Sequence, residues 1–111
     1  MSLGFTSLKK RKDFLRLRNN CSSLKTKNFI FNYKKDQSVS EPIVGITISN
    51  KVGNSVKRNY IKRLIRSIIS SNKKKFPQKI IIEIIAKRDI NPSFLNFNKD
   101  FLIFNDNFFT R

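Results

Sequence analysis

The stretch from residue 51 to residue 75 carries nine basic side chains and no acidic one. Within it, the segment from Ser55 to Ser71 has apolar residues at helical spacing and predicts a long amphipathic helix. Gly53 indicates a tight turn before this helix, and we expect either Asn54 or Ser55 to be its N-cap. A chain that contains such a helix must bury one of its faces against a core and leave the other for solvent or a partner.

A rotation of 100° per residue sorts the side chains of this helix into two faces. The apolar face, which we expect in the core, comprises Val56, Ile61, Leu64, Ile65 and Ile68. The basic stripe and its flanking side chains comprise Arg58, Lys62, Arg66, Asn59 and Arg63. An ordinary solvated face pairs opposite charges four residues apart, whereas like charges repel along this stripe. Arginine binds phosphate in a bidentate manner, and a helix N-terminus favours anions. The pattern therefore predicts a phosphate-binding surface; the alternative is a basic helix that meets only solvent.

The charge of the whole chain agrees with a polyanionic partner. The sequence has 24 basic and 7 acidic side chains, which gives a net charge of +17. Residues 1–88 hold a net charge of +18 and residues 89–111 a net charge of −1. Repulsion among so many positive charges disfavours a compact state. A surface that served solubility alone would not need this excess, because a mixture of positive and negative side chains also keeps a protein soluble. We therefore expect the basic residues 1–88 to bind the partner and residues 89–111 to serve mainly for packing.

Periodicity predicts the other elements of the fold. The expected strands run from Phe29 to Tyr33, from Ile43 to Ser49 and from Lys79 to Lys87, the last at the centre of its sheet. The expected helices run from Leu8 to Asn19 and from Asn96 to Phe108, with core contacts from Leu95, Phe101, Leu102 and Phe108. Because helices and strands mix without regular alternation, we predict a single α+β domain over residues 1–111.

The residue types exclude several kinds of chemistry. The sequence has no histidine, one cysteine and scattered carboxylates, so we expect no catalytic residue, no metal site and no cofactor bound by the chain itself. Cys21 has no partner for an intrachain disulfide, which agrees with a reducing compartment. No segment suits a signal peptide or a membrane span. We therefore expect a cytoplasmic chain with no membrane partner and no small-molecule substrate.

The segment from Lys51 to Arg66 resembles the signature of the bacterial ribonuclease P protein component family. In that family a Lys-x-Gly-Asn-x-Val turn leads into an Arg-Asn-Arg helix. The matching positions are Lys51, Gly53, Asn54, Val56, Arg58, Asn59, Lys62, Arg63 and Arg66. The opening around Asp13 and Phe14 and the segment from Ile84 to Arg88 resemble the family's first helix and last strand. Two positions depart from the pattern: Tyr60 stands at the second arginine, and Arg18 stands where the family usually has an aromatic side chain.

This resemblance implies a fold of α-β-β-β-α-β-α type with a four-stranded sheet and a left-handed β-α-β crossover, similar to domain 2 of ribosomal protein S5. It implies a protein subunit of bacterial ribonuclease P, the endoribonuclease that removes the 5′ leader of precursor tRNA. Its RNA subunit carries the catalysis and requires Mg²⁺. The implied partners are therefore the ribonuclease P RNA and precursor tRNA.

The resemblance also implies two binding surfaces. The RNA-binding residues would be Lys51, Asn54, Arg58, Asn59, Lys62, Arg63 and Arg66. The leader would lie in a cleft between the first helix and the sheet, for which we expect Lys10, Phe14, Phe29 and Phe31. Core packing is the other role open to Phe29 and Phe31, because strand aromatics are common in cores.

Two other classes of protein share part of these features. A ribosomal or other structural RNA-binding protein shares the charge but not the Gly-Asn turn with its Arg-Asn helix. A DNA-binding protein of the helix-turn-helix class needs a second short helix beside the first, and the sequence offers no segment for it. The sequence therefore favours an RNA partner.

Overall fold

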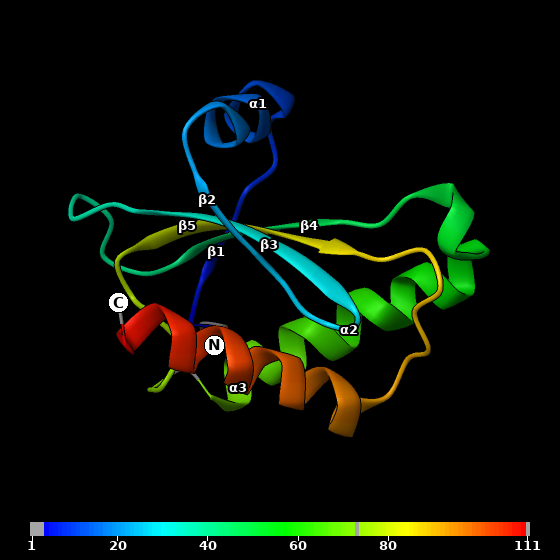
Figure 1. The fold of residues 1–111 in the computed structure, drawn as a ribbon. Helices are drawn as coiled ribbons and strands as arrows, with labels where there is room; N and C mark the ends of the chain where they lie inside the picture. Colours follow the sequence, from blue (N-terminus) through cyan, green and yellow to red (C-terminus); the bar gives the residue numbers. More distant parts are fainter. Residues whose placement is uncertain (1–3, 73, 111) are drawn as a thin grey trace.

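The computed structural model describes residues 4–72 and 74–110 of the chain. In this part of the chain, a five-stranded mixed sheet separates one helix from two others (Figure 1). The strands are β1 (Thr6–Ser7), β2 (Ser22–Lys25), β3 (Phe29–Lys35), β4 (Ile43–Thr47) and β5 (Ile80–Ala86). The helices are α1 (Arg11–Asn19), α2 (Ser55–Ser71) and α3 (Phe94–Thr110), and a 3-10 turn, η1 (Asn50–Val52), precedes α2.

The strand order is β1-β4-β5-β3-β2, so β5 is central as predicted. It pairs in parallel with β4 and antiparallel with β3, and α2 connects the two parallel strands. The α+β class and the order of the main elements are confirmed, whereas the left hand of the crossover stays a prediction. The sheet has five strands rather than four because Thr6 and Ser7 pair in parallel with β4. For the same reason α1 begins at Arg11 rather than at Leu8, whose amide donates to Val44.

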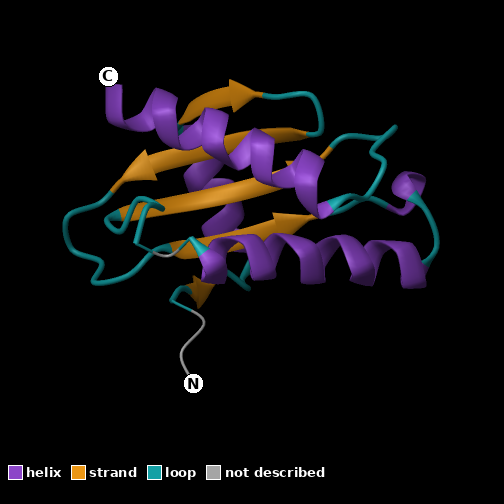
Figure 2. Ribbon diagram, turned by 90° about the horizontal axis from the view of Figure 1, so that it is seen from below, coloured by secondary structure: helices purple, strands orange, loops and turns teal. Residues whose placement is uncertain are grey.

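One face of the sheet is covered by both long helices, α2 and α3, which lie across it in Figure 2. The aromatic side chains of β3 on this face interlock with those of α3. Ring centroids lie 4.7 Å apart for Phe29 and Phe97, and 4.8 Å apart for Phe31 and Phe104. The isoleucines of β5 that point to the same face are fully buried, so the main core lies between the sheet and these two helices.

The rotation of α3 differs from the prediction. Leu95 and Leu102, which the sequence places in the core, are 64% and 42% exposed, while Phe97 and Phe104 are fully buried. The helix is apolar on several sides, and the match with the rings of β3 decides which side faces inward. In α2, Val56 is 78% exposed instead of buried, because it lies two and a half turns from Ile65 and therefore on the opposite side of the helix.

We expect Phe104→Ala to lower the free energy of unfolding by about 3–5 kcal/mol. The ring of Phe104 is fully buried and lies against Phe31, Tyr33 and Phe76. Phe109→Ala removes the same side chain from the same helix at a position that is 63% exposed, and it should cost less than about 1 kcal/mol. Urea denaturation measures both variants, and equal losses would show that α3 does not pack through this face.

Candidate nucleic-acid interface

Local hydrogen bonds fix the turn that leads into α2. The Asn54 side-chain oxygen accepts from the amide of Lys57 at 2.9 Å, so Asn54 is the N-cap. Gly53 has an extended backbone, with φ 160° and ψ −169°, and the turn therefore does not use the backbone freedom that the sequence suggests for it. A Cβ atom at this position would lie 2.6 Å from Cδ of Lys57. The atoms that it would meet all belong to the Lys57 side chain, whose far end can move aside, so the position is tight for a larger residue but does not require glycine.

Two of the predicted RNA-binding residues stabilise this turn. Nε of Arg58 donates to the carbonyl of Gly53 at 3.2 Å, and its Nη2 donates to Ser55 Oγ at 3.3 Å. Arg58 is therefore half-buried, and Asn54 is occupied as the cap. Lys51 is exposed on η1, where its amide donates to Ser49 Oγ. The turn thus presents the start of α2 in a fixed orientation.

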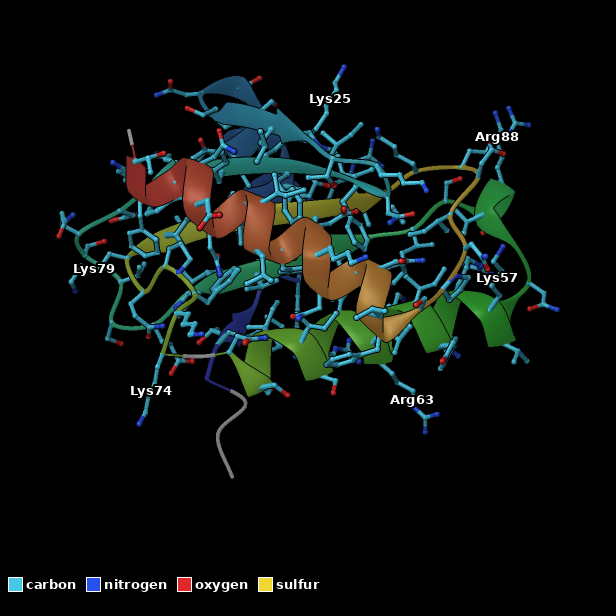
Figure 3. All side chains as sticks on the ribbon, turned by 60° about the horizontal axis from the view of Figure 1, so that its bottom comes forward. Lys25, Lys57, Arg63, Lys74, Lys79 and Arg88 are labelled. Atoms are coloured by element: carbon cyan, nitrogen blue, oxygen red, sulfur yellow. The ribbon has the colours of Figure 1, made fainter. Side chains whose placement is uncertain are left out.

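The remaining predicted residues form what we call the α2 surface, an open hollow of about 580 Å³ lined by Val56, Asn59, Tyr60, Lys62, Arg63 and Arg66. Arg63 extends from the helix away from the rest of the molecule (Figure 3). Tyr60, which stands at the position of the family's second arginine, is 48% exposed on this surface. Cations surround an aromatic ring here, and none of the residues that line the hollow is acidic. This combination suits phosphates and the face of a base.

A second surface lies on the other side of the sheet, where only α1 covers it (Figure 1). Leu17 is buried against the sheet, and Phe14 is half-buried one turn earlier. The ring of Phe14 rests on Gly45 of β4, because a Cβ atom at Gly45 would lie 2.4 Å from Cε1 of that ring. The absence of a side chain at Gly45 therefore creates the seat for Phe14.

Phe14 lines an open cleft of about 440 Å³, which we call the α1 cleft; its lining comprises Lys9, Arg11, Phe14, Leu15, Arg18 and Thr47. The prediction of Phe14 as a cleft residue agrees with this position. Lys10, which we expect in the cleft, is the exposed N-cap residue of α1 and is not part of this lining. The cations that border the ring are Lys9, Arg11 and Arg18 instead.

The prediction that Phe29 and Phe31 line the cleft is wrong. Both rings are fully buried on the opposite face of the sheet, against α3. Side chains alternate along a strand, so the residues of β3 that face α1 are Ile30, Asn32 and Lys34. The sequence shows that β3 has two faces but not which helix covers each.

Behind two of the residues that line the α1 cleft, Arg18 and Thr47, lies a buried carboxylate that the sequence pattern did not predict as part of the site. Glu83 of β5 is fully buried and accepts from Arg18 through two atoms, Nε at 2.8 Å and Nη2 at 2.6 Å. Thr47 Oγ1 donates to the same carboxylate at 2.5 Å. Burial alone would raise the pKa of Glu83, but the hydrogen bonds and charge of Arg18, with Thr47 and Asn32, hold it below its usual range. The only available sequence signal was an acid within an apolar strand.

The two surfaces meet at the β1 edge of the sheet. A small hollow of about 150 Å³ lies there, and Lys9, Lys62 and Arg66 are among the residues that line it. Lys9 also borders the α1 cleft, and Lys62 and Arg66 also border the α2 surface. A single nucleic-acid chain or two adjacent ones can therefore follow a continuous basic path from α1 to α2.

Within residues 4–72 and 74–110, no three His, Cys, Asp or Glu side chains are grouped so that they could hold a metal ion. None of the helices described in this part of the chain is long and apolar enough to cross a membrane. The α2 surface and the α1 cleft present cations and aromatic rings, which suit phosphates and bases. A small α+β domain with an acid-free basic helix and a half-open aromatic cleft has the features of a nucleic-acid-binding protein.

Comparison with known proteins identifies the family. Residues 4–104 match the family described as Ribonuclease P. The Ribonuclease P protein component of Syntrophus aciditrophicus is 38% identical over 80 residues, which cover 72% of this chain and 66% of the relative. That of Dictyoglomus turgidum is 37% identical over 93 residues, which cover 83% and 76%. The solved structure of the RNase P protein from Thermotoga maritima superposes with a TM-score of 0.79 at 25% identity and covers 88% of this chain and 93% of that one. The chain belongs to the family of bacterial ribonuclease P protein components.

The stability of the chain should depend on pH through Glu83. The pKa of Glu83 is lowered in the folded chain, so its contribution is present above the ordinary value of 4.5 and is lost as the pH falls below that value. We expect the free energy of unfolding of the wild type to fall more steeply between pH 5 and about pH 3 than that of the double variant Arg18→Met, Glu83→Gln. The double variant keeps the net charge of the chain. Parallel curves from denaturation at each pH would contradict the expected role of Glu83.

Proposed function

We propose that this chain is the protein subunit of a ribonuclease P ribonucleoprotein in which an RNA subunit carries the catalysis. The observation that carries the proposal is the continuous basic path, free of acidic side chains on α2 and joined to an aromatic cleft, in a member of this family. The chain supplies binding surfaces for the RNA subunit and for precursor tRNA. Mg²⁺ is bound by the RNA rather than by this chain, and the assembly works in the bacterial cytoplasm.

In this proposal the α2 surface binds the RNA subunit. Arg63 and Arg66 supply exposed guanidinium groups for phosphate oxygens, and Lys62 adds a charge between α2 and the β1 edge. Arg58 and Asn54 act on binding through the turn, because their polar atoms hold the start of α2. Tyr60 offers an aromatic ring to an unpaired base of the same RNA.

The α1 cleft in turn holds the 5′ leader of precursor tRNA. A single strand exposes its bases, and an aromatic ring bordered by cations binds both the bases and the phosphates. Phe14 provides the ring, and Gly45 allows the ring to lie directly on the sheet. Lys9 connects this cleft to the α2 surface. A ribosomal or other structural RNA-binding role is not favoured by the family membership.

The double variant Arg63→Gln, Arg66→Gln should bind the ribonuclease P RNA more weakly and with less dependence on salt. Each lost phosphate contact removes about one unit from the slope of log K against log salt concentration, so we expect a decrease of about two units. The control variant Lys25→Gln, Lys99→Gln also loses two exposed charges, from β2 and α3. Titration of labelled RNA at several salt concentrations measures both. Equal slopes for the two double variants would place the RNA contact elsewhere.

The proposal as a whole is tested with the reconstituted holoenzyme at low magnesium concentration. We expect the chain to stimulate 5′ maturation and Phe14→Ala to weaken the affinity of the holoenzyme for precursor tRNA by about 1–3 kcal/mol. Affinity for mature tRNA should stay nearly unchanged, because mature tRNA has no leader. If both affinities fell together along with the melting temperature, Phe14 would be a core residue only, and no stimulation at all would contradict the proposed function.

A further inference from the structure

Arg18, which lines the α1 cleft, forms an ion pair with the buried Glu83 behind it, and the proposed function does not use this pair. The Glu83 side chain is 0% exposed, whereas that of Arg18 is 43% exposed. Glu83 lies at the centre of a row across the sheet, with Asn32 of β3 on one side and Gly45 of β4 on the other. The seat of Phe14 is Gly45 itself, so the ion pair is directly beside the aromatic ring.

The contact with Glu83 fixes the plane of the guanidinium group. A guanidinium has five N–H donors in a rigid fork, and Glu83 accepts one from Nε and one from Nη2. The other donors of Arg18 have no partner among the residues that the structure describes, and Arg18 borders the cleft. The cleft therefore contains hydrogen-bond donors whose orientation is set before any ligand binds.

The same pairing changes what Arg18 is suited to bind. Glu83 offsets its charge, so Arg18 attracts a phosphate less strongly than Lys9 and Arg11 do at the same cleft, since neither of these forms an ion pair with a residue that the structure describes. Its oriented donors remain available for neutral acceptors. Two parallel donors match a base edge with two adjacent acceptors, as guanine presents with O6 and N7. Cytosine presents O2 and N3 when it is unpaired. On its Watson–Crick and Hoogsteen edges adenine places the N6 amino donor beside each acceptor, and uracil places the N3 donor between its two acceptors.

We propose that Arg18, oriented by Glu83, selects a guanine or cytosine in the single-stranded 5′ leader while the ring of Phe14 stacks on that base. This selection rests on the proposed binding of the leader in the α1 cleft. Arg18 is the residue that determines specificity, and Glu83 is a positioning residue that acts through it. The phosphates of the same nucleotides are left to Lys9 and Arg11.

The test uses the holoenzyme and a pool of precursor tRNAs with randomised leader nucleotides. Relative values of kcat/KM are obtained by sequencing the products at early times. We expect a preference of about tenfold for guanine or cytosine at one leader position, and precursors of fixed sequence then distinguish the two bases. In Arg18→Lys, which keeps a charge opposite Glu83 but loses the fork, the preference at that position should fall to about twofold or less.

A second variant keeps the test decisive if Arg18→Lys disturbs the fold. Arg18→Met combined with Glu83→Gln retains the packing volume and the net charge, and it should lose the same preference at the same position. Retention of the preference in both variants would overturn the inference. Absence of any base preference in the wild type, with precursor still bound more tightly than mature tRNA, would overturn the selection but not leader binding. Equal affinity for precursor and mature tRNA would overturn leader binding itself.

Discussion

The interlocking of β3 with α3 is the contact on which the arrangement of this molecule depends. Phe29 and Phe31 fill the space between the sheet and α3, and α2 closes the rest of the same face with its isoleucines. Once that face is complete, the other face has only α1 to cover it. A helix of nine residues is too short to close a sheet of this width. The cleft beside α1 is therefore a direct consequence of how the main core is packed.

The half-covered face explains why an acidic residue lies at the centre of a chain with a net charge of +17. A buried ion pair contributes little net stability, since desolvation opposes the attraction between the two charges. The pair of Glu83 and Arg18 does fix the orientation of α1 on the sheet, because Arg18 lies one position after the buried Leu17. The same contact between Arg18 and Glu83 thus positions α1 and orients a side chain that lines the α1 cleft. A substitution of Glu83 should therefore change both the free energy of unfolding and the ligand preference of the cleft.

The turn before α2 divides the signature residues into two groups. Asn54 and Arg58 use their polar atoms within the protein, where they hold the start of the helix. Arg63 and Arg66 are exposed on the surface of the helix instead. Residues that look equivalent in a motif therefore differ in structure: some hold the backbone of the turn, and others extend from the helix surface. The short strand β1 adds the link between the surfaces, because it carries the chain past α2 before α1 begins.

Much of the fold follows from local sequence. The bounds of α2, Ser55–Ser71, agree with the prediction because the capping residue Asn54 directly precedes the helix and the helical periodicity lies within it. The central place of β5 follows from its nearly continuous run of isoleucine. The sequence also predicts the basic face of α2, since the direction of a side chain around a helix depends only on its position along the chain.

Tertiary structure decided what local pattern leaves open. An alternating strand shows two faces without saying which helix meets each, so the fully buried Phe29 and Phe31 could be taken for cleft residues. A helix that is apolar on several sides, such as α3, receives its rotation from the rings it packs against. The pairing of Arg18 with Glu83 joins residues 65 positions apart. Such a contact depends on the order of the strands in the sheet, and no periodicity within either segment encodes that order.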